Sequence, residues 1–447
     1  GQSGVLLVAM AGLLLSFHWA VTVILFCAAG PGVLLRLKNS RRLYRWARRQ
    51  TEEERKANYL NWILTGDLYA KELRLFGLGG LFQSRFREIR KRLRDERIAL
   101  SRKRYFGELA AQTMAVVAVF GCFLFIVYRT VQGMITLGDM VMYYQAFQRG
   151  MNALRGVLRG LADLYEDNLF LYNLLEFLSL ESRVREPAHP VPVPRPMRQG
   201  FVFEEVGFAY PGTEKRVLES VSLSIRPGEV AALVGRNGSG KTTLVKLLCR
   251  LYAPVEGRIL LDGSDLRRFK TADLRREISV VFQDYVRFYM TARENIRFGS
   301  VSLPSDDPRI AEAAQDAGVD DLIRALPAGY DTILGRRFED GVELSVGEWQ
   351  KIALARAFVR DAQIVVLDEP TSSMDAKSEL DVFEGFKSLL KGRAAVLISH
   401  RFSTVKMADT IYVLDQGRIV EAGAHADLIK EGGMYAELFE SQARRYR

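Results

Sequence analysis

The sequence is poor in cysteine and histidine. Its 447 residues include three cysteines and four histidines. The cysteines, Cys27, Cys122 and Cys249, stand singly in apolar or helical contexts, are odd in number and show no C-x-x-C spacing. This pattern predicts buried, small apolar residues in a reducing compartment.

The beginning of the chain lacks an initiator methionine, a charged leader and a small-residue cleavage site. The apolar run that starts there is therefore not expected to be a signal peptide. We expect Gly1 to be an arbitrary cut, with further sequence before it.

The basic residues lack interleaved aromatic residues and match no nucleic-acid-binding module, although the net charge is +10 and the pI about 9.4. They gather directly after apolar blocks, as in cytoplasmic loops beside membrane spans. We therefore expect no nucleic-acid partner. The clustered residues are Arg36, Lys38, Arg41, Arg42, Arg45, Arg48, Arg49, Arg90, Lys91, Arg92, Arg94, Arg97, Arg102, Lys103 and Arg104.

The apolar residues are concentrated before Leu180, so the mean hydropathy of −0.01 averages a membrane part and a soluble part. Val5–Phe17 and Trp19–Leu35 are apolar runs that break at His18, which predicts a hairpin of two spans. Glu108–Tyr128 is a cleaner single span, because about 20 apolar residues cross a bilayer.

The stretch from Thr136 to about Leu180 predicts an amphipathic helix with a polar stripe along one side. A lipid-facing arginine at the bilayer centre costs about 2.5–3.5 kcal/mol, so a helix with three of them is expected to line a water-filled cavity. A cytoplasmic helix stays open as an alternative for its C-terminal half. The stripe consists of Gln145, Gln148, Arg149, Asn152, Arg155, Arg159 and Asp163.

Between the spans, Lys38–Arg104 is charged and helically periodic, which predicts two helices that extend into the cytoplasm. Their turn is expected near Gly77–Phe82, where glycines leave apolar residues at an exposed tip. A proline-rich segment, 181–199, predicts an extended linker between a helical membrane domain, 1–180, and a second domain, 200–447. In the second domain, strand-like runs alternate with helical segments, as in a mainly parallel α/β sheet. These runs are Val230–Val234, Ile278–Phe282, Ile364–Leu367 and Ala394–Ile398.

A glycine-rich segment follows the first of these strands and opens a helix, as a phosphate-binding loop (Walker A) requires. Backbone N–H groups at the helix N-terminus would enclose the phosphates of ATP, Lys241 would neutralise their charge, and the Thr242 hydroxyl would bind Mg²⁺. The segment consists of Gly235, Arg236, Asn237, Gly238, Ser239, Gly240, Lys241, Thr242 and Thr243.

The apolar run Ile364–Leu367 ends in two carboxylates, Asp368 and Glu369. Asp368 is expected to hold Mg²⁺ through water, and Glu369 to orient or deprotonate the attacking water.

The segment Leu344–Gln350, L-S-V-G-E-W-Q, resembles the signature motif of ATP-binding cassette (ABC) proteins. The N-terminal part is similar to the membrane domain of exporter-type half-transporters. The resemblance implies six spans, about four of which are found here, so the first two would be missing. The apolar tip would correspond to the coupling helix.

The resemblance also implies roles for single residues. Tyr210 would stack on adenine, and Gln283 would bind nucleotide and Mg²⁺ as the Q-loop residue. Asp375 would be the D-loop aspartate, and His400 would act beside the γ-phosphate. Ser345 and Gly347 would meet the γ-phosphate bound to a second half.

The signature departs from the family pattern at two positions, since Val346 replaces glycine and Glu348 replaces glutamine. A β-branched residue tolerates positive φ poorly, so the contact of the signature with phosphate is expected to be weakened.

The function that follows is ATP-driven export across a cell membrane, with the nucleotide-binding domain in the cytoplasm. A partner half, identical or homologous, completes each ATP site. A weakly hydrolysing regulatory half and a soluble cassette ATPase that acts on nucleic acid or ribosomes are the alternatives. The three arginines of the polar stripe favour a substrate with an anionic group.

Overall fold

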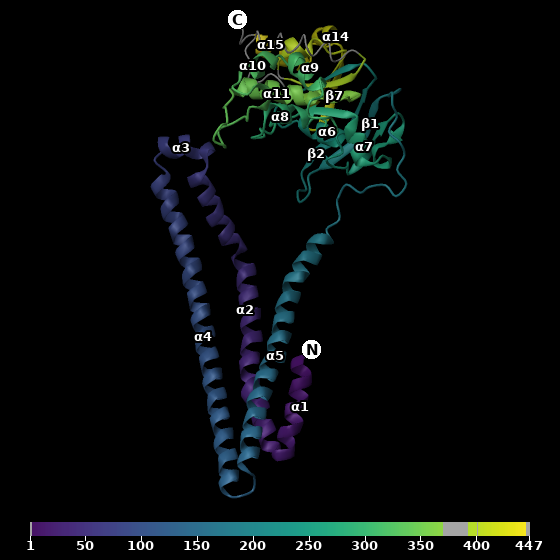
Figure 1. Cartoon of the computed structure of the whole chain (residues 1–447). Helices are drawn as coiled ribbons and strands as arrows, with labels where there is room; N and C mark the ends of the chain where they lie inside the picture. Colours follow the sequence, from purple (N-terminus) through teal and green to yellow (C-terminus); the bar gives the residue numbers. More distant parts are fainter. Residues whose placement is uncertain (1, 370–391, 400, 444–447) are drawn as a thin grey trace. The chain divides into compact units, whose positions relative to one another are not determined.

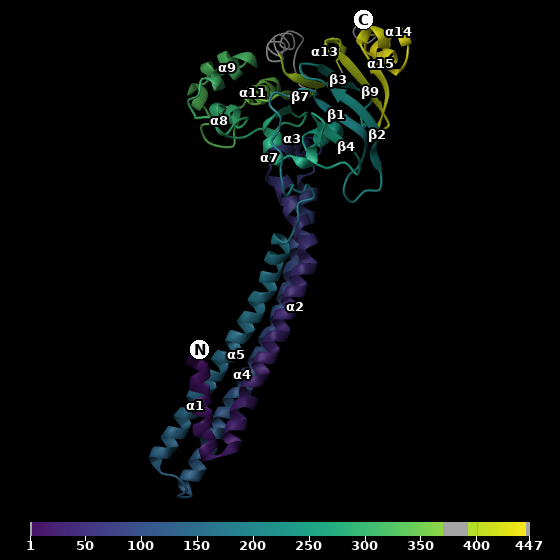
Figure 2. The ribbon, with the colours of Figure 1, turned by 90° about the vertical axis from the view of Figure 1, so that its right-hand side faces the viewer.

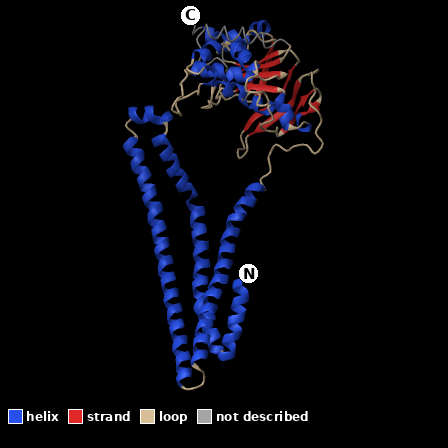
Figure 3. Ribbon diagram, in the orientation of Figure 1, coloured by secondary structure: helices blue, strands red, loops and turns tan. Residues whose placement is uncertain are grey.

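The computed structural model describes residues 2–369, 392–399 and 401–443. The chain divides into two compact units, residues 1–180 and 181–447 (Figure 1). The first unit is helical and the second combines helices with sheets (Figure 3). This is the predicted fold class.

Four helices build most of the first unit: α1 (Gln2–Phe17), α2 (Trp19–Thr65), α4 (Gly79–Val131) and α5 (Leu137–Leu178). Helix α2 contacts α1, α4 and α5, and the second view shows α2, α4 and α5 as long rods (Figure 2). The predicted spans and their cytoplasmic extensions are therefore single, continuous helices. A short helical turn, η1 (Asp67–Tyr69), and helix α3 (Ala70–Leu75) join α2 to α4.

The ends of these helices follow local capping chemistry. The break predicted at His18 is confirmed, because its Nδ1 accepts a hydrogen bond from the backbone N–H of Ala20 at 3.2 Å and so caps α2. Thr136 and Asp139 form a capping box at the start of α5. Gly77, with φ of 62°, lies in the predicted turn, whereas Gly79 and Gly80 already belong to α4.

The core of the first unit joins α1, α2, α4 and α5. It includes Leu14, Leu25, Ile126 and Phe147, each 0% exposed. Gly150 permits close packing of α5, because a Cβ there would lie 2.9 Å from Leu25 Cδ1.

The apolar surface of the first unit is extensive. Among the described residues, one helix, α4, is long and apolar enough to cross a membrane, while Gln2–Phe17 and Trp19–Ala28 are shorter apolar helices. Val116, Val117 and Phe120 of α4 are more than 60% exposed. Cys27 is also exposed, so its predicted burial is wrong, because Leu25 and Ala28 are the residues of this turn of α2 that are buried; Cys122 and Cys249 are buried as predicted.

The second unit contains two sheets. A six-stranded sheet has the order β10-β9-β3-β8-β7-β6 and is parallel except for the β9–β10 pair. Every residue of β7 and β8 is buried, as expected for central parallel strands. Its strands are β3 (Val230–Val234), β6 (Ile278–Val281), β7 (Ile364–Asp368), β8 (Ala394–Ile398), β9 (Thr410–Asp415) and β10 (Arg418–Gly423).

The other sheet has four antiparallel strands in the order β2-β1-β4-β5. They are β1 (Phe201–Ala209), β2 (Arg216–Ile225), β4 (Glu256–Leu261) and β5 (Ser264–Asp265). This sheet is not among the predicted elements. A shared apolar core that includes Phe203, Leu233 and Leu244 joins it to the six-stranded sheet.

The helices of the second unit are mostly short. They are α6 (Lys241–Leu248), α7 (Thr271–Arg276), α8 (Ala292–Arg297), α9 (Arg309–Asp316), α10 (Asp320–Ala325), α11 (Val346–Phe358), α13 (Phe402–Val405), α14 (His425–Glu431) and α15 (Met434–Ala443), with the turns η2 (Leu266–Arg268) and η3 (Gly329–Asp331). Helix α11 packs in a core with α8, α9 and β6.

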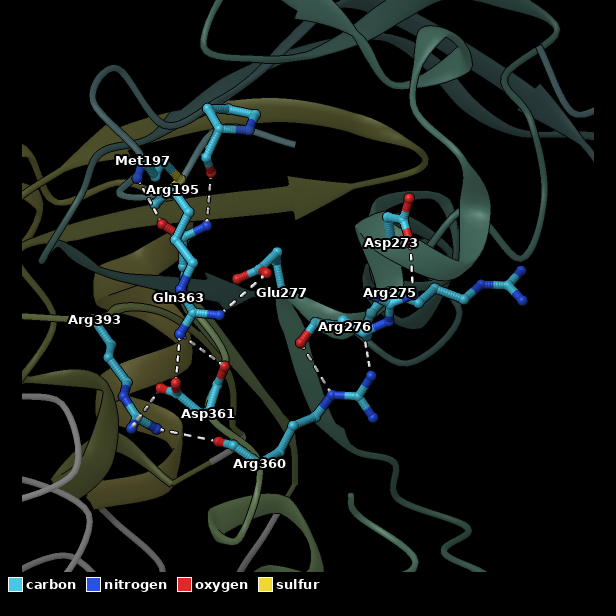
Figure 4. A network of polar contacts seen from close by, with 11 residues as sticks. Arg195, Met197, Asp273, Arg275, Arg276, Glu277, Arg360, Asp361, Gln363 and Arg393 are labelled. Carbon is cyan, nitrogen blue, oxygen red and sulfur yellow. Dashed lines mark hydrogen bonds and ion pairs between the residues drawn. The ribbon is translucent and has the colours of Figure 1, made fainter. Parts of the chain in front are cut away.

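The predicted linker is docked on the second unit by a polar network around Gln363 (Figure 4). Gln363 Oε1 accepts from the Met197 N–H at 2.6 Å, and Gln363 Nε2 donates to the Pro194 carbonyl at 2.9 Å. Arg195 pairs with Glu277 at 3.3 Å and with Asp361 at 2.5 Å. These contacts fix the proline-rich segment to the start of β7.

Candidate nucleotide-binding site

The glycine-rich loop joins β3 to α6 and has a backbone that only glycine adopts easily. Gly235, Gly238 and Gly240 have φ of 150°, 81° and 113°. A Cβ at Gly235 would lie 2.0 Å from the Leu414 carbonyl oxygen, and one at Gly240 would lie 2.6 Å from Leu218 Cδ2. The compact loop therefore leads directly into the first turn of α6, whose backbone N–H groups have no partner within the helix. These N–H groups can bind an anion.

Lys241 is the first residue of α6 and is only 6% exposed. Its Nζ donates to the carbonyl oxygens of Gly235 at 2.8 Å and Arg236 at 3.0 Å. Burial lowers the pKa of Lys241, while the carboxylates of Glu369 and Asp368 oppose this shift. The ammonium group is thus held inside the loop, where phosphate oxygens would satisfy its charge.

Two of the three predicted metal-binding side chains, Thr242 and Asp368, meet, whereas the third, Gln283, bonds Glu369. Thr242 Oγ1 donates to Asp368 Oδ2 at 2.9 Å across 126 sequence positions. Asp368 is 2% exposed, and burial raises its pKa against the effect of the Thr242 hydrogen bond. A hydroxyl and a carboxylate oxygen are the hard donors that Mg²⁺ prefers, so these residues fit the ion.

Glu369 directly follows β7 and lies beside the predicted Q-loop residue. Gln283 Nε2 donates to Glu369 Oε2 at 2.7 Å. The phosphate loop, Gln283, Asp368 and Glu369 line one cleft of about 440 Å³. The carboxylate is therefore placed where it could act on a water molecule next to bound phosphate.

The remaining predicted site residues do not line this cleft or lie outside the described residues. The Tyr210 hydroxyl lies 3.0 Å from Thr243 Oγ1, and its ring packs edge-to-face on Tyr252 at 5.3 Å. Ser345 and Gly347 do not belong to the described lining of the cleft. Ser239 is buried, and its hydroxyl has no partner within the described ranges. His400 and Asp375 lie outside the described residues.

The signature segment forms a regular helix start. Ser345 caps α11 through a capping box with Glu348, whose side chain accepts from the Ser345 N–H at 2.7 Å. Val346 is the first residue of α11 and does not have a positive φ. Valine is therefore not strained at position 346, and Glu348 performs the same capping as a glutamine would. The expected weakening of the signature's contact with phosphate stays a prediction.

Two residues of the site had no predicted role. Gln350, the last residue of the signature segment Leu344–Gln350, donates from Nε2 to the Glu369 carbonyl at 3.4 Å. The Tyr285 hydroxyl donates to the Val346 carbonyl at 2.9 Å. Neither contact has a sequence signal of its own, because both join residues more than 15 positions apart.

Comparison with known proteins agrees with this geometry. A profile of the ABC transporter family matches residues 218–372. The nisin transport ATP-binding protein NisT of Lactococcus lactis is 30% identical over 411 residues, which cover 92% of this chain and 68% of NisT. The chain belongs to the ABC transporter family. Membership implies ATP binding and, together with the apolar helix α4, indicates a membrane protein.

This ABC transporter chain spans only part of the length of its other relatives. The subtilin transport ATP-binding protein SpaT of Bacillus subtilis is 34% identical over 87% of this chain, which spans 63% of SpaT. The ATP-dependent lipid A-core flippase of Cupriavidus metallidurans is 45% identical over 58% of this chain and 45% of the flippase. A bacterial Atm1-family ABC exporter with ATP bound has a similar structure, with a TM-score of 0.83 and 28% identity over 99% of this chain and 76% of the exporter.

Proposed function

We propose that this chain is one half of an exporter that couples ATP hydrolysis to transport across a membrane. The observation that carries the proposal is the single cleft that joins Lys241, Thr242, Gln283, Asp368 and Glu369. When bound, Mg²⁺ would neutralise phosphate charge and hold the reacting phosphate in place. The similarity to NisT and to the Atm1-family exporter also extends over the helical unit of this chain.

Each residue of the cleft has its own role in ATP hydrolysis. The α6 N-terminus and Lys241 bind and orient the phosphates, while Thr242 and Asp368 hold the metal ion. Gln283 positions the carboxylate of Glu369, which accepts a proton from the attacking water. Tyr210 would bind the adenine, and His400 would contact the γ-phosphate.

The proposed partner is a second half-transporter. Ser345 and Gly347, which the family resemblance assigns to the γ-phosphate, do not line the described cleft of their own chain. A second copy or a homologous chain would place its own signature segment at this cleft. In the same way, Ser345 of this chain would contact the nucleotide bound to the partner. The ATPase units would then lie in the cytoplasm, with the helical units in the cell membrane.

The polar stripe of α5 supports a substrate with an anionic group. Arg149, Arg155 and Arg159 are exposed, whereas Phe147 and Leu154 of the same helix are buried against the neighbouring helices. Relatives of this chain are named for the transport of subtilin and nisin and for lipid A-core. We infer that this half-transporter exports a substrate that carries an anionic group.

The catalytic assignment is tested by Glu369→Gln in the full chain, purified from membranes and reconstituted in lipid nanodiscs. Loss of the general base is expected to lower kcat for ATP by about 10²–10⁴-fold, because that is the usual contribution of such a group. ATP binding, measured with a fluorescent nucleotide, should persist as the control. Unchanged turnover would overturn the assignment of Glu369.

A further inference from the structure

Glu369 has an unusual backbone. Its φ is 53°, in the left-handed region that residues other than glycine seldom adopt. Such a conformation persists only where its neighbours fix it, and it is common at functional sites. The contacts that hold Glu369 therefore decide where its carboxylate points.

Among the described residues, Glu369 forms hydrogen bonds with groups from three separate parts of the chain. Its N–H donates to the Ile398 carbonyl at the end of β8, at 2.8 Å. Gln283 holds its carboxylate at 2.7 Å. The third bond comes from α11, where Gln350 Nε2 donates to the Glu369 carbonyl at 3.4 Å.

Packing alone does not explain a glutamine at position 350. It is 2% exposed, and its Oε1 is buried without a hydrogen-bond partner in the part of the chain that the structure describes. Leucine or methionine would fill the same volume without burying an unpaired polar atom. The amide is therefore better explained by its contact with Glu369 than by its contribution to the core.

Helix α11 connects this contact to the signature. Ser345 caps the helix and Gly347 lies in its first turn, less than two turns before Gln350. A second connection also joins the signature to Glu369. The Tyr285 hydroxyl donates to the Val346 carbonyl, and Tyr285 lies two residues after Gln283, which holds the Glu369 carboxylate. The start of α11 and Glu369 are thus tied through both Gln350 and the Gln283–Tyr285 segment.

We propose that Gln350 is a positioning residue for Glu369, which makes the orientation of Glu369 depend on the placement of the signature helix. This inference rests on the proposed function, in which the signature meets the nucleotide of the partner half while Glu369 serves the nucleotide of its own chain. Gln350 then links the two ATP sites of the transporter within one chain.

The test is Gln350→Met in the reconstituted full-length transporter, because methionine keeps the volume and removes both polar atoms. We expect kcat to fall about tenfold, the effect of one ordinary hydrogen bond lost from the transition state. KM for ATP should stay within about twofold, and nucleotide binding in a Glu369→Gln background should be unchanged. A merely structural role would instead raise KM or lower Tm without a selective loss of kcat.

Two further variants make the result decisive. Gln350→Glu keeps the length and Oε1 but loses the N–H donor, so it should show the same selective loss of kcat, also where Gln350→Met does not fold. Gln315→Met, on the exposed surface of α9, is the matched control and should retain full activity. Wild-type kcat in a folded Gln350→Met protein overturns this inference alone. A wild-type protein without ATPase activity overturns it together with the proposed function.

Discussion

At the scale of single residues, the buried carboxylate of Asp368 lowers the stability of its own domain. Its carboxylate is buried at the end of β7 with Glu369 as its neighbour in sequence. Burial raises the pKa of Asp368 above its ordinary value of 3.8, so the folded protein binds this proton more tightly than the unfolded chain does. The free energy of unfolding therefore decreases as the pH rises from the pKa of the unfolded chain to that of the folded protein. Above the pKa of the folded protein, the destabilisation by Asp368 is complete.

Asp368→Asn should consequently stabilise the nucleotide-free protein while it abolishes Mg²⁺-dependent ATP hydrolysis. We expect a gain of about 0.5–2 kcal/mol at pH 7.5, typical of a substitution that relieves an active-site cost. Thermal unfolding should show a higher Tm at pH 7.5 and a smaller gain as the pH falls toward the ordinary pKa of an aspartate. Asp306→Asn, on the surface, is the control, and a lower Tm for Asp368→Asn at pH 7.5 would contradict the prediction.

Residues of the site differ in how far the sequence reveals them. Lys241, Thr242 and Asp368 could be predicted because their chemistry depends on short-range patterns, a glycine-rich loop before a helix and acidic residues after an apolar strand. Gln350 could not, because its importance lies in one contact with a carbonyl 19 positions away. The effect of Val346 on the contact with phosphate stays a prediction, although its φ shows that valine is not strained there.

At the scale of elements, the strands that could be predicted are the buried parallel ones. Val230–Val234 and Ala394–Ile398 have the bounds of β3 and β8, because central strands are continuous apolar runs. The antiparallel sheet was missed because its strands carry mixed patterns; β2, for instance, alternates buried and exposed residues irregularly. Periodicity also predicted the long helices, but it could not show that span and extension are continuous.

The docked linker leads to a prediction at this scale. Gln363→Leu removes both the acceptor for the Met197 N–H and the donor to the Pro194 carbonyl. We expect the second unit to lose about 1–3 kcal/mol of stability, because two backbone groups lose their partner. Hydrogen exchange and limited proteolysis should show faster opening within residues 190–197.

Gln363→Glu is the matched control for the linker, since it retains the acceptor for Met197 and loses only the donor. It should open the linker less than Gln363→Leu does. Equal protection of residues 190–197 in the wild type and in Gln363→Leu would show that the linker is held by the apolar contacts of Val191, Val193 and Met197 instead.

At the scale of the whole molecule, the cleft and the signature segment of one chain would belong to two different ATP sites of the proposed dimer. The chain carries Lys241 and Glu369 in the cleft, and it presents Ser345 and Val346 at the start of α11, where Val346 is 48% exposed. An exposed helix start that is not part of its own cleft is consistent with a site completed by a second chain. Two such chains would bind two ATP molecules between them.

This arrangement predicts a cross-link between copies. Asn237→Cys, in the exposed phosphate loop, and Ser345→Cys should form a disulfide between two co-expressed chains when ATP is added in a Glu369→Gln background, because bound, unhydrolysed ATP holds both residues at one interface. Val301→Cys, exposed at another surface, should not form a disulfide with Ser345→Cys under the same conditions. Native mass spectrometry of the complex purified from its own membranes identifies the partner. Two copies without the ATP-dependent cross-link would contradict the shared ATP site, and a different second chain would mean that the half-transporter works as a heterodimer.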